Sequence, residues 1–232
     1  MKLVYSSYTD KKIERLKEME AFHFWSVARR KLILNCLKKY SPGKKILDVG
    51  CGSGSLLFFL KQNGYLAEGV DSHAAAPIQA SAEKLPFLEG QFDALILADV
   101  LEHIEEKKAL EEAFRVLTPK GILLLSVPAF SWLWSRRDVE AGHLRRYNAK
   151  EIFQIARIFN AKILFFSYYQ FFLFPLFFLS RLFNTDPKRE ELISPWINAC
   201  LLWVNSFEIW LGKWIRWPFG SSMIVVMQKN GR

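Results

Sequence analysis

The chain has 232 residues, of which 51% are hydrophobic and 15% aromatic, and its formal net charge is +9 at pH 7. This composition excludes a disordered chain, and the length fits one domain with an elaboration. The first 45 residues contain twelve Lys and Arg against four Asp and Glu. Such an excess attracts nucleic acid, anionic lipid or an acidic substrate, or forms solvated helix faces. No basic run is dense enough to indicate a nucleic-acid groove.

The cysteines and the N-terminal segment indicate the compartment. Cys36, Cys51 and Cys200 are far apart and form no CxxC pair, so the sequence predicts neither a disulfide framework nor a metal site. The first twenty residues lack the apolar core of a signal peptide. We therefore expect a reducing, cytoplasmic compartment.

Helical and extended segments alternate along the chain. Helices are expected over residues 10–40 (with a break at 21–24), 55–63, 107–117 and 149–159, and strands at 45–49, 67–70, 77–80, 93–98, 122–127, 162–168 and 222–228. The triplet Pro119-Lys120-Gly121 is expected to be a turn. This order predicts an α/β fold with a doubly wound, mostly parallel sheet. Ligands of such sheets bind where the strands end.

A glycine turn follows the first expected strand. Gly50, Gly52 and Gly54 form a GxGxG pattern, which lets backbone N–H groups approach a ligand. The nicotinamide fingerprint is GxGxxG, with its third glycine one place later. Asp48 precedes the turn and suits a cationic amine, and Asp71 ends the second strand, where it can accept ribose hydroxyls.

Five motifs in order resemble the class I S-adenosylmethionine-dependent methyltransferases. They read LDVGCGSG, GVD, AEKLPF, FDALILADVLEHI and RVLTPKGILLLSVP, and they lie between Lys44 and Ala129. The resemblance implies a Rossmann-like, seven-stranded sheet whose last strand is antiparallel, with S-adenosylmethionine as cofactor. The cofactor contacts that it implies are Asp48, Gly50, Cys51, Gly52, Gly54, Asp71, Ser72, Ser81, Ala82, Glu83, Asp99, Val100, Leu101 and His103. Ser81 stands where the family often has the Asp that contacts the adenine amino group.

Histidines at the ends of strands are the candidate bases. A sulfonium methyl is already activated, so the protein must position a nucleophile and remove its proton. His103 follows the fourth strand, and His143 belongs to DVEAGHLRRY, Asp138 to Tyr147. We expect His143 or His103 to take a proton from a hydroxyl, with Asp99 and Tyr147 in the same catalytic group. Alternatively, each histidine is an ordinary polar loop residue.

Two further segments resemble a bacterial subgroup of these enzymes. They are DVEAGHLRRY and EAFHFWSVARR, Glu20 to Arg30. The expected substrate-binding residues are His23, Trp25, Arg29, Arg145 and Arg146. The arginines can bind a carboxylate or phosphate of the substrate, or else brace acidic loops.

Aromatic residues gather near the C-terminus. Residues 163–180 are uncharged, and their number is the lower limit for a membrane-spanning helix. Pro175 and Gln170 interrupt this segment, and its first half is needed for strand six, so we do not expect a span. In residues 195–220, Trp203, Phe207, Trp210 and Trp214 recur at helical spacing with basic neighbours. We expect a helical insertion that forms a lid, a homodimer face or a membrane-surface contact.

The sequence thus predicts a single domain over 1–232. It comprises an N-terminal helical cap (1–40), a cofactor-binding core (41–170), an aromatic helical insertion (171–220) and the last strand (221–232). The expected function is methyl transfer to oxygen of a small-molecule or lipid-linked acceptor, in a protein that is cytoplasmic or peripheral on the inner membrane surface. The alternatives are a non-catalytic membrane-surface module, a nicotinamide-dependent oxidoreductase and, favoured only by charge, a nucleic-acid methyltransferase. Against the nucleic-acid alternative, this sequence has no Asn/Asp-Pro-Pro-Tyr/Phe motif after strand four.

Overall fold

The computed structural model describes residues 20–73, 76–182 and 193–231. The helix expected before residue 20 lies outside these residues. A seven-stranded sheet forms the centre of the molecule, in the order β3-β2-β1-β4-β5-β7-β6. Only β7 is antiparallel to its neighbours, so the predicted mostly parallel sheet is confirmed.

The strands and helices alternate as the hydrophobic pattern predicts. The strands are β1 (Lys45–Val49), β2 (Leu66–Asp71), β3 (Ile78–Gln79), β4 (Phe92–Ala98), β5 (Leu117–Pro128), β6 (Ala161–Tyr169) and β7 (Ser222–Lys229). The α-helices with described bounds are α2 (Phe24–Tyr40), α3 (Ser55–Gln62), α4 (Glu106–Val116), α5 (Arg136–Ala141), α6 (Ala149–Ile158), α7 (Phe174–Leu182) and α9 (Pro195–Leu211). Two short 3₁₀ turns, η1 (Leu101–His103) and η2 (Ser131–Leu133), follow β4 and β5.

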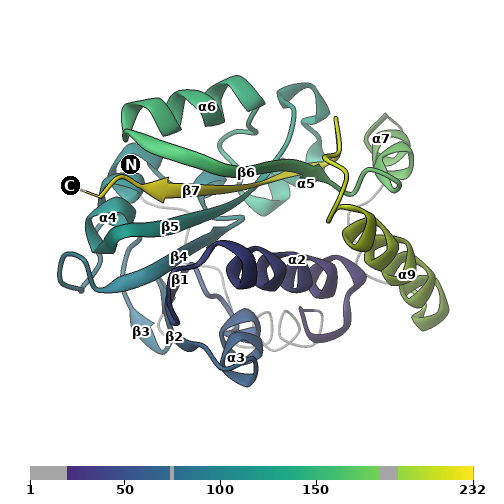
Figure 1. Cartoon of the computed structure of the whole chain (residues 1–232). Helices are drawn as coiled ribbons and strands as arrows, with labels where there is room; N and C mark the ends of the chain where they lie inside the picture. The colour runs from purple at the N-terminus through teal and green to yellow at the C-terminus, as the bar shows by residue number, and fades with distance from the viewer. Residues whose placement is uncertain (1–19, 74–75, 183–192, 232) are drawn as a thin grey trace.

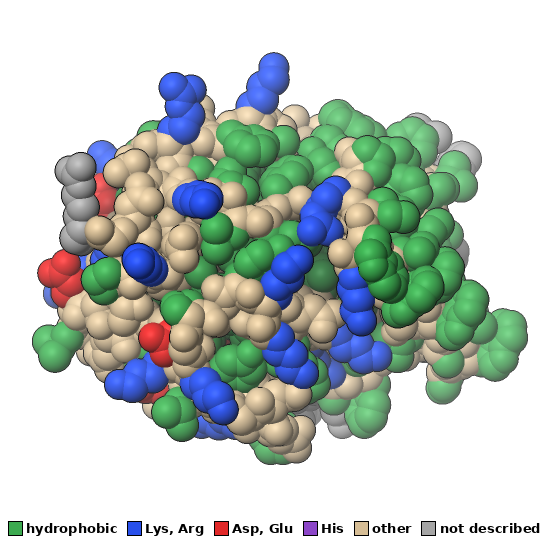
Figure 2. All heavy atoms as spheres, in the orientation of Figure 1, with side chains coloured by type: hydrophobic (Ala, Val, Ile, Leu, Met, Phe, Trp, Pro, Cys, Tyr) green, Lys and Arg blue, Asp and Glu red, His purple; other side chains and the backbone are tan. Residues whose placement is uncertain are grey.

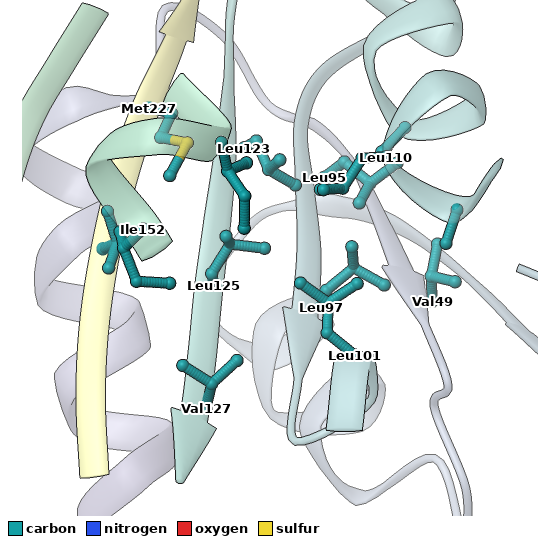
Figure 3. Packing of buried hydrophobic residues seen from close by; sticks show 14 of the residues in the cluster. Val49, Leu95, Leu97, Leu101, Leu110, Leu123, Leu125, Val127, Ile152 and Met227 are labelled. Atoms are coloured by element: carbon teal, nitrogen blue, oxygen red, sulfur yellow. The ribbon is translucent and has the colours of Figure 1, made fainter. Parts of the chain in front are cut away.

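Helices cover both faces of the sheet (Figure 1). On one face α4 and α6 pack over β4 and β5, and this core contains Leu95, Leu110, Leu125 and Ile152 (Figure 3). On the other face α2 and α3 bury Leu37 against the opposite side chains of the same strands. Because β4 and β5 are covered twice, they are apolar along nearly their whole length.

The structure corrects two expectations. Residues 119–121 form an irregular part of β5 instead of a turn before it, because Lys120 adopts a φ of 64° and the chain rejoins the ladder at Ile122. The segment after β5, expected as one long loop, contains α5, whose N-cap Ser135 forms a reciprocal capping box with Asp138.

The expected helical insertion before the last strand is confirmed as α7 and α9, at the end of the sheet where β5 and β6 finish (Figure 1). The side chain of Asn198 on α9 accepts a hydrogen bond from Phe24 N (2.7 Å) and donates one to Phe22 O (2.8 Å). The insertion therefore contacts the start of α2. Within the described residues, no helix has the length and hydropathy that a bilayer span requires.

Candidate active site

The glycine turn connects β1 to α3. Gly50, Gly52 and Gly54 have φ values of 76°, 49° and 77°, in the left-handed region that favours glycine. A Cβ on Gly50 would lie 2.4 Å from Val100 Cγ2, so a residue from the β4 loop covers the turn. Two loops at neighbouring strand ends therefore form one wall, and both were expected to contact the cofactor.

Asp48 is buried directly before this turn. Its side chain is 2% exposed, and Oδ2 has no hydrogen-bond partner among the described residues. Burial raises the pKa of Asp48 to about 7, although the Arg29 guanidinium lowers it in part. A buried carboxylate oxygen without a partner fits the primary amine of an amino acid, which would supply both the charge and the hydrogen bond.

A pocket opens beside Asp48 between the glycine turn, β4 and α2. Three charged residues of the N-terminal segment reach it: Glu20 is hydrogen-bonded to Ser53, Arg30 to Ser55, and Arg29 is paired with Asp99. The pocket is lined by Glu20, Ser26, Arg29, Arg30, Asp48, Gly50, Cys51, Ser55, Leu56 and Ala98. Burial raises the pKa of the Cys51 thiol to about 12, so Cys51 lines this pocket as a neutral side chain.

Asp71 lies at the end of β2, next to the same turn. One carboxylate oxygen accepts a hydrogen bond from Gly52 N (2.9 Å) and the other from His73 N (3.0 Å). Oδ2 keeps a second lone pair that suits a ribose hydroxyl, whereas Oδ1 also accepts a long hydrogen bond from Ser72 Oγ (3.4 Å). Ser72, the adjacent predicted contact, is exposed.

The predicted adenine contacts follow β3 in a tight turn. Ser81 Oγ accepts a hydrogen bond from Glu83 N (3.2 Å), and the carboxylate of Glu83 accepts one from Glu105 N (3.2 Å) at the start of α4. Ala82 is half-buried against the core. Ser81 and Glu83 thus each accept one backbone hydrogen bond within this turn.

Asp99 directly follows β4 in a left-handed conformation, with φ of 58°. One carboxylate oxygen accepts a hydrogen bond from Ser126 Oγ (2.9 Å), and the other is paired with Arg29 of α2. Ser126 Oγ is also hydrogen-bonded to Tyr169 Oη (2.9 Å). A polar network from four elements thus holds Asp99 at the strand end.

The two histidines expected to act on the acceptor lie together. The ring centroids of His103 and His143 are 4.8 Å apart, in an edge-to-face arrangement. Backbone contacts join their loops, because Leu144 N donates to Glu102 O (2.7 Å) and His103 Nδ1 lies 3.3 Å from Gly142 O. Burial and the neighbouring His143 lower the pKa of His103, which favours its neutral form.

Asp138 anchors the second motif. It is buried, and its Oδ1 lies 2.9 Å from His143 Nδ1. Arg146 donates to both carboxylate oxygens (2.8 and 3.0 Å) and to Ala129 O (3.0 Å). Burial alone would raise the pKa of Asp138, but hydrogen bonds from His143 and Arg146 outweigh it and hold the pKa far below the usual range.

The remaining residues of this motif brace the loop. Arg145 is paired with Glu106 (3.2 Å) and Glu151 (2.6 Å). Tyr147 is fully buried, and its hydroxyl donates to Leu101 O (3.2 Å) or Glu106 Oε2 (2.9 Å). With Arg146 held by Asp138, these contacts favour the bracing alternative for both arginines and a positioning role for Tyr147.

Two predicted substrate contacts lie at the start of α2. The His23 ring accepts from Trp25 N (3.4 Å) and so caps the helix, while the Arg29 guanidinium lies 4.3 Å from the centre of the Trp25 ring. Trp25 thus orders the arginine that holds Asp99.

Sequence reasoning missed the residues that connect the motifs. Ser126 lies in a segment predicted only as a strand, Tyr169 lies just beyond another, and Glu102 was not among the predicted site residues. Asp138 was noted only as the start of a motif. Its five-residue spacing from His143 is a usable signal, since Gly142, with φ of 77°, turns the chain back after α5.

Comparisons with known proteins agree with this geometry. The sequence model of a methyltransferase domain matches residues 19–164, more than half of the chain. The chain therefore belongs to the methyltransferase domain family, and its cofactor is S-adenosylmethionine, the predicted one. The unpartnered Asp48 oxygen and the glycine turn fit the amino-acid end of this cofactor.

Curated relatives match only part of their length. The ubiquinone/menaquinone biosynthesis C-methyltransferase UbiE of Vibrio vulnificus is 33% identical over 128 residues, covering 44% of this chain and 49% of the relative. The ubiquinone biosynthesis O-methyltransferase of Psychrobacter cryohalolentis is 32% identical over 104 residues, covering 36% and 40%. An uncharacterised methyltransferase of a Synechocystis species is 33% identical over 100 residues, covering 37% and 47%. The matched region thus spans less than half of each of these relatives.

Solved structures share the fold. A geranyl diphosphate methyltransferase in complex with its diphosphate and sinefungin has a TM-score of 0.61 at 14% identity, covering 88% of this chain and 78% of that chain. Phosphoethanolamine N-methyltransferase 2 of Haemonchus contortus, in complex with S-adenosylmethionine, has a TM-score of 0.60 at 18% identity, covering 97% and 58%. The [4+2]-cyclase SpnF has a TM-score of 0.58 at 18% identity, covering 90% and 83%. At these identities the likeness establishes the fold alone.

Proposed function

We propose that this protein transfers the methyl group of S-adenosylmethionine to a hydroxyl oxygen of a small-molecule or lipid-linked acceptor. The observation that carries the proposal is the pairing of His103 with His143 beside the strand end that holds Asp99. An oxygen nucleophile must lose a proton during transfer, and a neutral imidazole is suited to take it. A carbon acceptor activated by an adjacent hydroxyl also needs removal of the hydroxyl proton. Because that step already makes the oxygen a nucleophile, transfer to oxygen is the simpler assignment.

The relatives support this acceptor class without defining it. Two of them are named for quinone biosynthesis, one as an O-methyltransferase and one as a C-methyltransferase. Quinone precursors are aromatic hydroxyl compounds with apolar tails, which matches a histidine pair next to an aromatic insertion. The GxGxG spacing and the family match argue against the nicotinamide-dependent alternative.

The insertion has its polarity reversed relative to an ordinary surface helix. The buried positions of α9 are Asn205 and Glu208, and Glu208 accepts a hydrogen bond from Phe172 N (3.1 Å). Its outward positions are aromatic, with Trp203 70% exposed. Glu208 therefore joins this helix to the segment that follows β6, while the apolar side chains of the helix are left in contact with solvent.

The outward side chains form a continuous surface, which we call the aromatic face (Figure 2). Its exposed members are Leu176, Phe178, Leu179, Trp196, Ile197, Trp203, Phe207, Trp210, Trp214 and Ile215. Lys213 and Arg216 are exposed among them. Tryptophan with adjacent cations is typical of the water–lipid boundary, so we propose that the aromatic face rests on an anionic membrane, where it meets lipid-linked acceptors.

A transfer assay tests the chemistry. The protein is incubated with methyl-labelled S-adenosylmethionine and a catechol or hydroquinone, either in buffer or in anionic vesicles, and the label is located by mass spectrometry. We expect label on oxygen and a loss of at least about 100-fold in turnover in the His103→Ala or His143→Ala variant. Full turnover in both variants contradicts a histidine role, and label on carbon contradicts the assignment to oxygen.

Vesicle flotation tests the membrane contact. We expect the protein to float with anionic vesicles, and to remain bound in part at high salt because aromatic side chains enter the lipid. Trp203→Ser with Trp210→Ser should abolish the salt-resistant fraction, whereas Phe58→Ser, an exposed aromatic on α3, should not. Failure to float at any salt concentration contradicts the membrane proposal and favours a lid or a homodimer face, which sedimentation would distinguish.

A further inference from the structure

Three side chains that can bind a metal meet where the loop after β4 contacts the loop after α5. Glu102, His103 and His143 each offer a ligand atom, and these atoms all lie within 4.8 Å of one another. The first two belong to η1 after β4, and His143 follows α5, so only the fold brings them together. Two imidazoles and one carboxylate form a ligand set suited to divalent transition metals.

Glu102 supplies a second observation that points to a cation. The residue is 1% exposed, and Oε2 has no hydrogen-bond partner among the described residues. The nearby arginines do not fill this gap, because Arg29 is paired with Asp99 and Arg146 donates to Asp138 and Ala129. A buried carboxylate in this position is stabilised either by a proton or by a bound cation.

The hydrogen bonds around His143 resemble the outer shell of a metal site. Asp138 is an acceptor held ionised by Arg146, so His143 Nδ1 donates to it at 2.9 Å and the lone pair lies on Nε2. A carboxylate that orients an imidazole in this way is common at metal centres. The Nδ1 atom of His103 is likewise 3.3 Å from a backbone carbonyl, that of Gly142.

We propose that Glu102, His103 and His143 bind one divalent transition metal ion of the Zn²⁺ type, leaving positions open to an acceptor oxygen. Nitrogen and oxygen ligands lie about 2.1 Å from Zn²⁺, so the three side chains close toward the ion on binding. The cysteine spacing predicts no metal site, and this inference revises that expectation with Glu102 and His103 on one loop and His143 on another.

The role of the ion rests on the proposed function. A hydroxyl bound to the ion has a lowered pKa and releases its proton to solvent. Its oxygen then attacks the methyl carbon, the S–CH₃ bond breaks, and the electron pair returns to sulfur, leaving S-adenosylhomocysteine. With the ion bound, the two imidazoles hold it and the proton leaves to solvent, whereas in the ion-free protein an imidazole accepts the proton as proposed above.

Direct metal titration tests the site without any turnover. The full chain is prepared with Cys200→Ser, because this exposed thiol is a competing ligand, and is freed of metal by chelator. Zn²⁺ binding is measured by calorimetry, and Co²⁺ is used as a spectroscopic probe of ligand number. We expect one ion per chain, bound at least about ten-fold more weakly in Glu102→Gln and in His143→Asn.

Matched controls keep the result interpretable. Glu68→Gln and His73→Asn replace the same residue types elsewhere on the surface and should bind Zn²⁺ as the parent does. S-adenosylhomocysteine binding in each preparation shows that the fold is intact. Absence of a stoichiometric ion in the parent, or Zn²⁺ affinity in the Glu102→Gln and His143→Asn variants equal to that of the parent, overturns the metal site. Neither result bears on methyl transfer, which the labelled-cofactor assay measures independently.

Discussion

Replacing Asp48 with Asn removes a charge that the fold buries without a partner. The folded-state pKa of this carboxyl is about 7, against an ordinary value of 3.8. Because the pKa is raised in the folded state, the protonated form stabilises the fold below pH 4, and this stabilisation is lost as the pH rises through 7. At about 1.4 kcal/mol per pKa unit, the free energy of unfolding is lower than its value below pH 4 by about 4 kcal/mol at pH 8 and by about 2 kcal/mol at pH 5.

The Asp48→Asn chain carries no such cost, since its side chain stays neutral. We expect it to be more stable than the parent by up to about 4 kcal/mol at pH 8, and by progressively less as the pH falls toward 4. Urea unfolding in the absence of cofactor, at several pH values between 4 and 8, measures the difference. An Asp48→Asn chain that is less stable than the parent at pH 8, or a difference independent of pH, would refute the reasoning.

Three further substitutions test the remaining parts of the site. Arg29→Met should lower the free energy of unfolding by about 2–3 kcal/mol, because it leaves the partly buried Asp99 carboxylate without its cation; a loss below about 1 kcal/mol in urea unfolding contradicts this. Asp138→Asn should lower the free energy of unfolding by about 3–5 kcal/mol at neutral pH, because it removes the carboxylate that Arg146 binds. It should also remove the loss of stability that the parent shows as the pH falls below about 4, since the lowered pKa of Asp138 stabilises the fold only while this carboxyl is ionised. Acid titrations followed by circular dichroism test this, and an unchanged acid transition argues against it. Gly50→Ala should weaken S-adenosylhomocysteine binding and destabilise the fold by about 1–3 kcal/mol, through its φ of 76° and its contact with Val100. Val100→Ala in the same chain should restore part of the stability, and no restoration would leave the steric account unsupported.

Much of the fold follows from local pattern. The apolar runs of β1 and β4, the glycine turn between β1 and α3, and the spacing of the helices predict the doubly wound, mostly parallel sheet. Irregular backbone is less predictable, because the bulge at Lys120 depends on pairing with β4. The reversed polarity of α9 also escapes periodicity, which gives the spacing of aromatic residues but not the side that contacts protein.

The candidate site likewise contains residues that the sequence predicts and contacts that only the fold reveals. Asp48, Asp71 and the glycines are adjacent to strand ends, where sequence and topology together place them. The links between motifs are not visible in this way, because His103 and His143 are far apart in the sequence and are brought together by contacts between their loops, such as Leu144 N to Glu102 O and His103 Nδ1 to Gly142 O. Whether Arg145 braces a loop or binds substrate depends on partners such as Glu106, which only the folded chain identifies.

The most direct measurement is calorimetric titration of S-adenosylhomocysteine into the parent and into the Asp48→Asn chain at pH 8, with NAD as the comparison ligand. The account predicts one site in the parent, binding at least about ten-fold weaker in the variant, and no binding of NAD. Binding of NAD without binding of S-adenosylhomocysteine, or equal S-adenosylhomocysteine affinity in both chains, would contradict it.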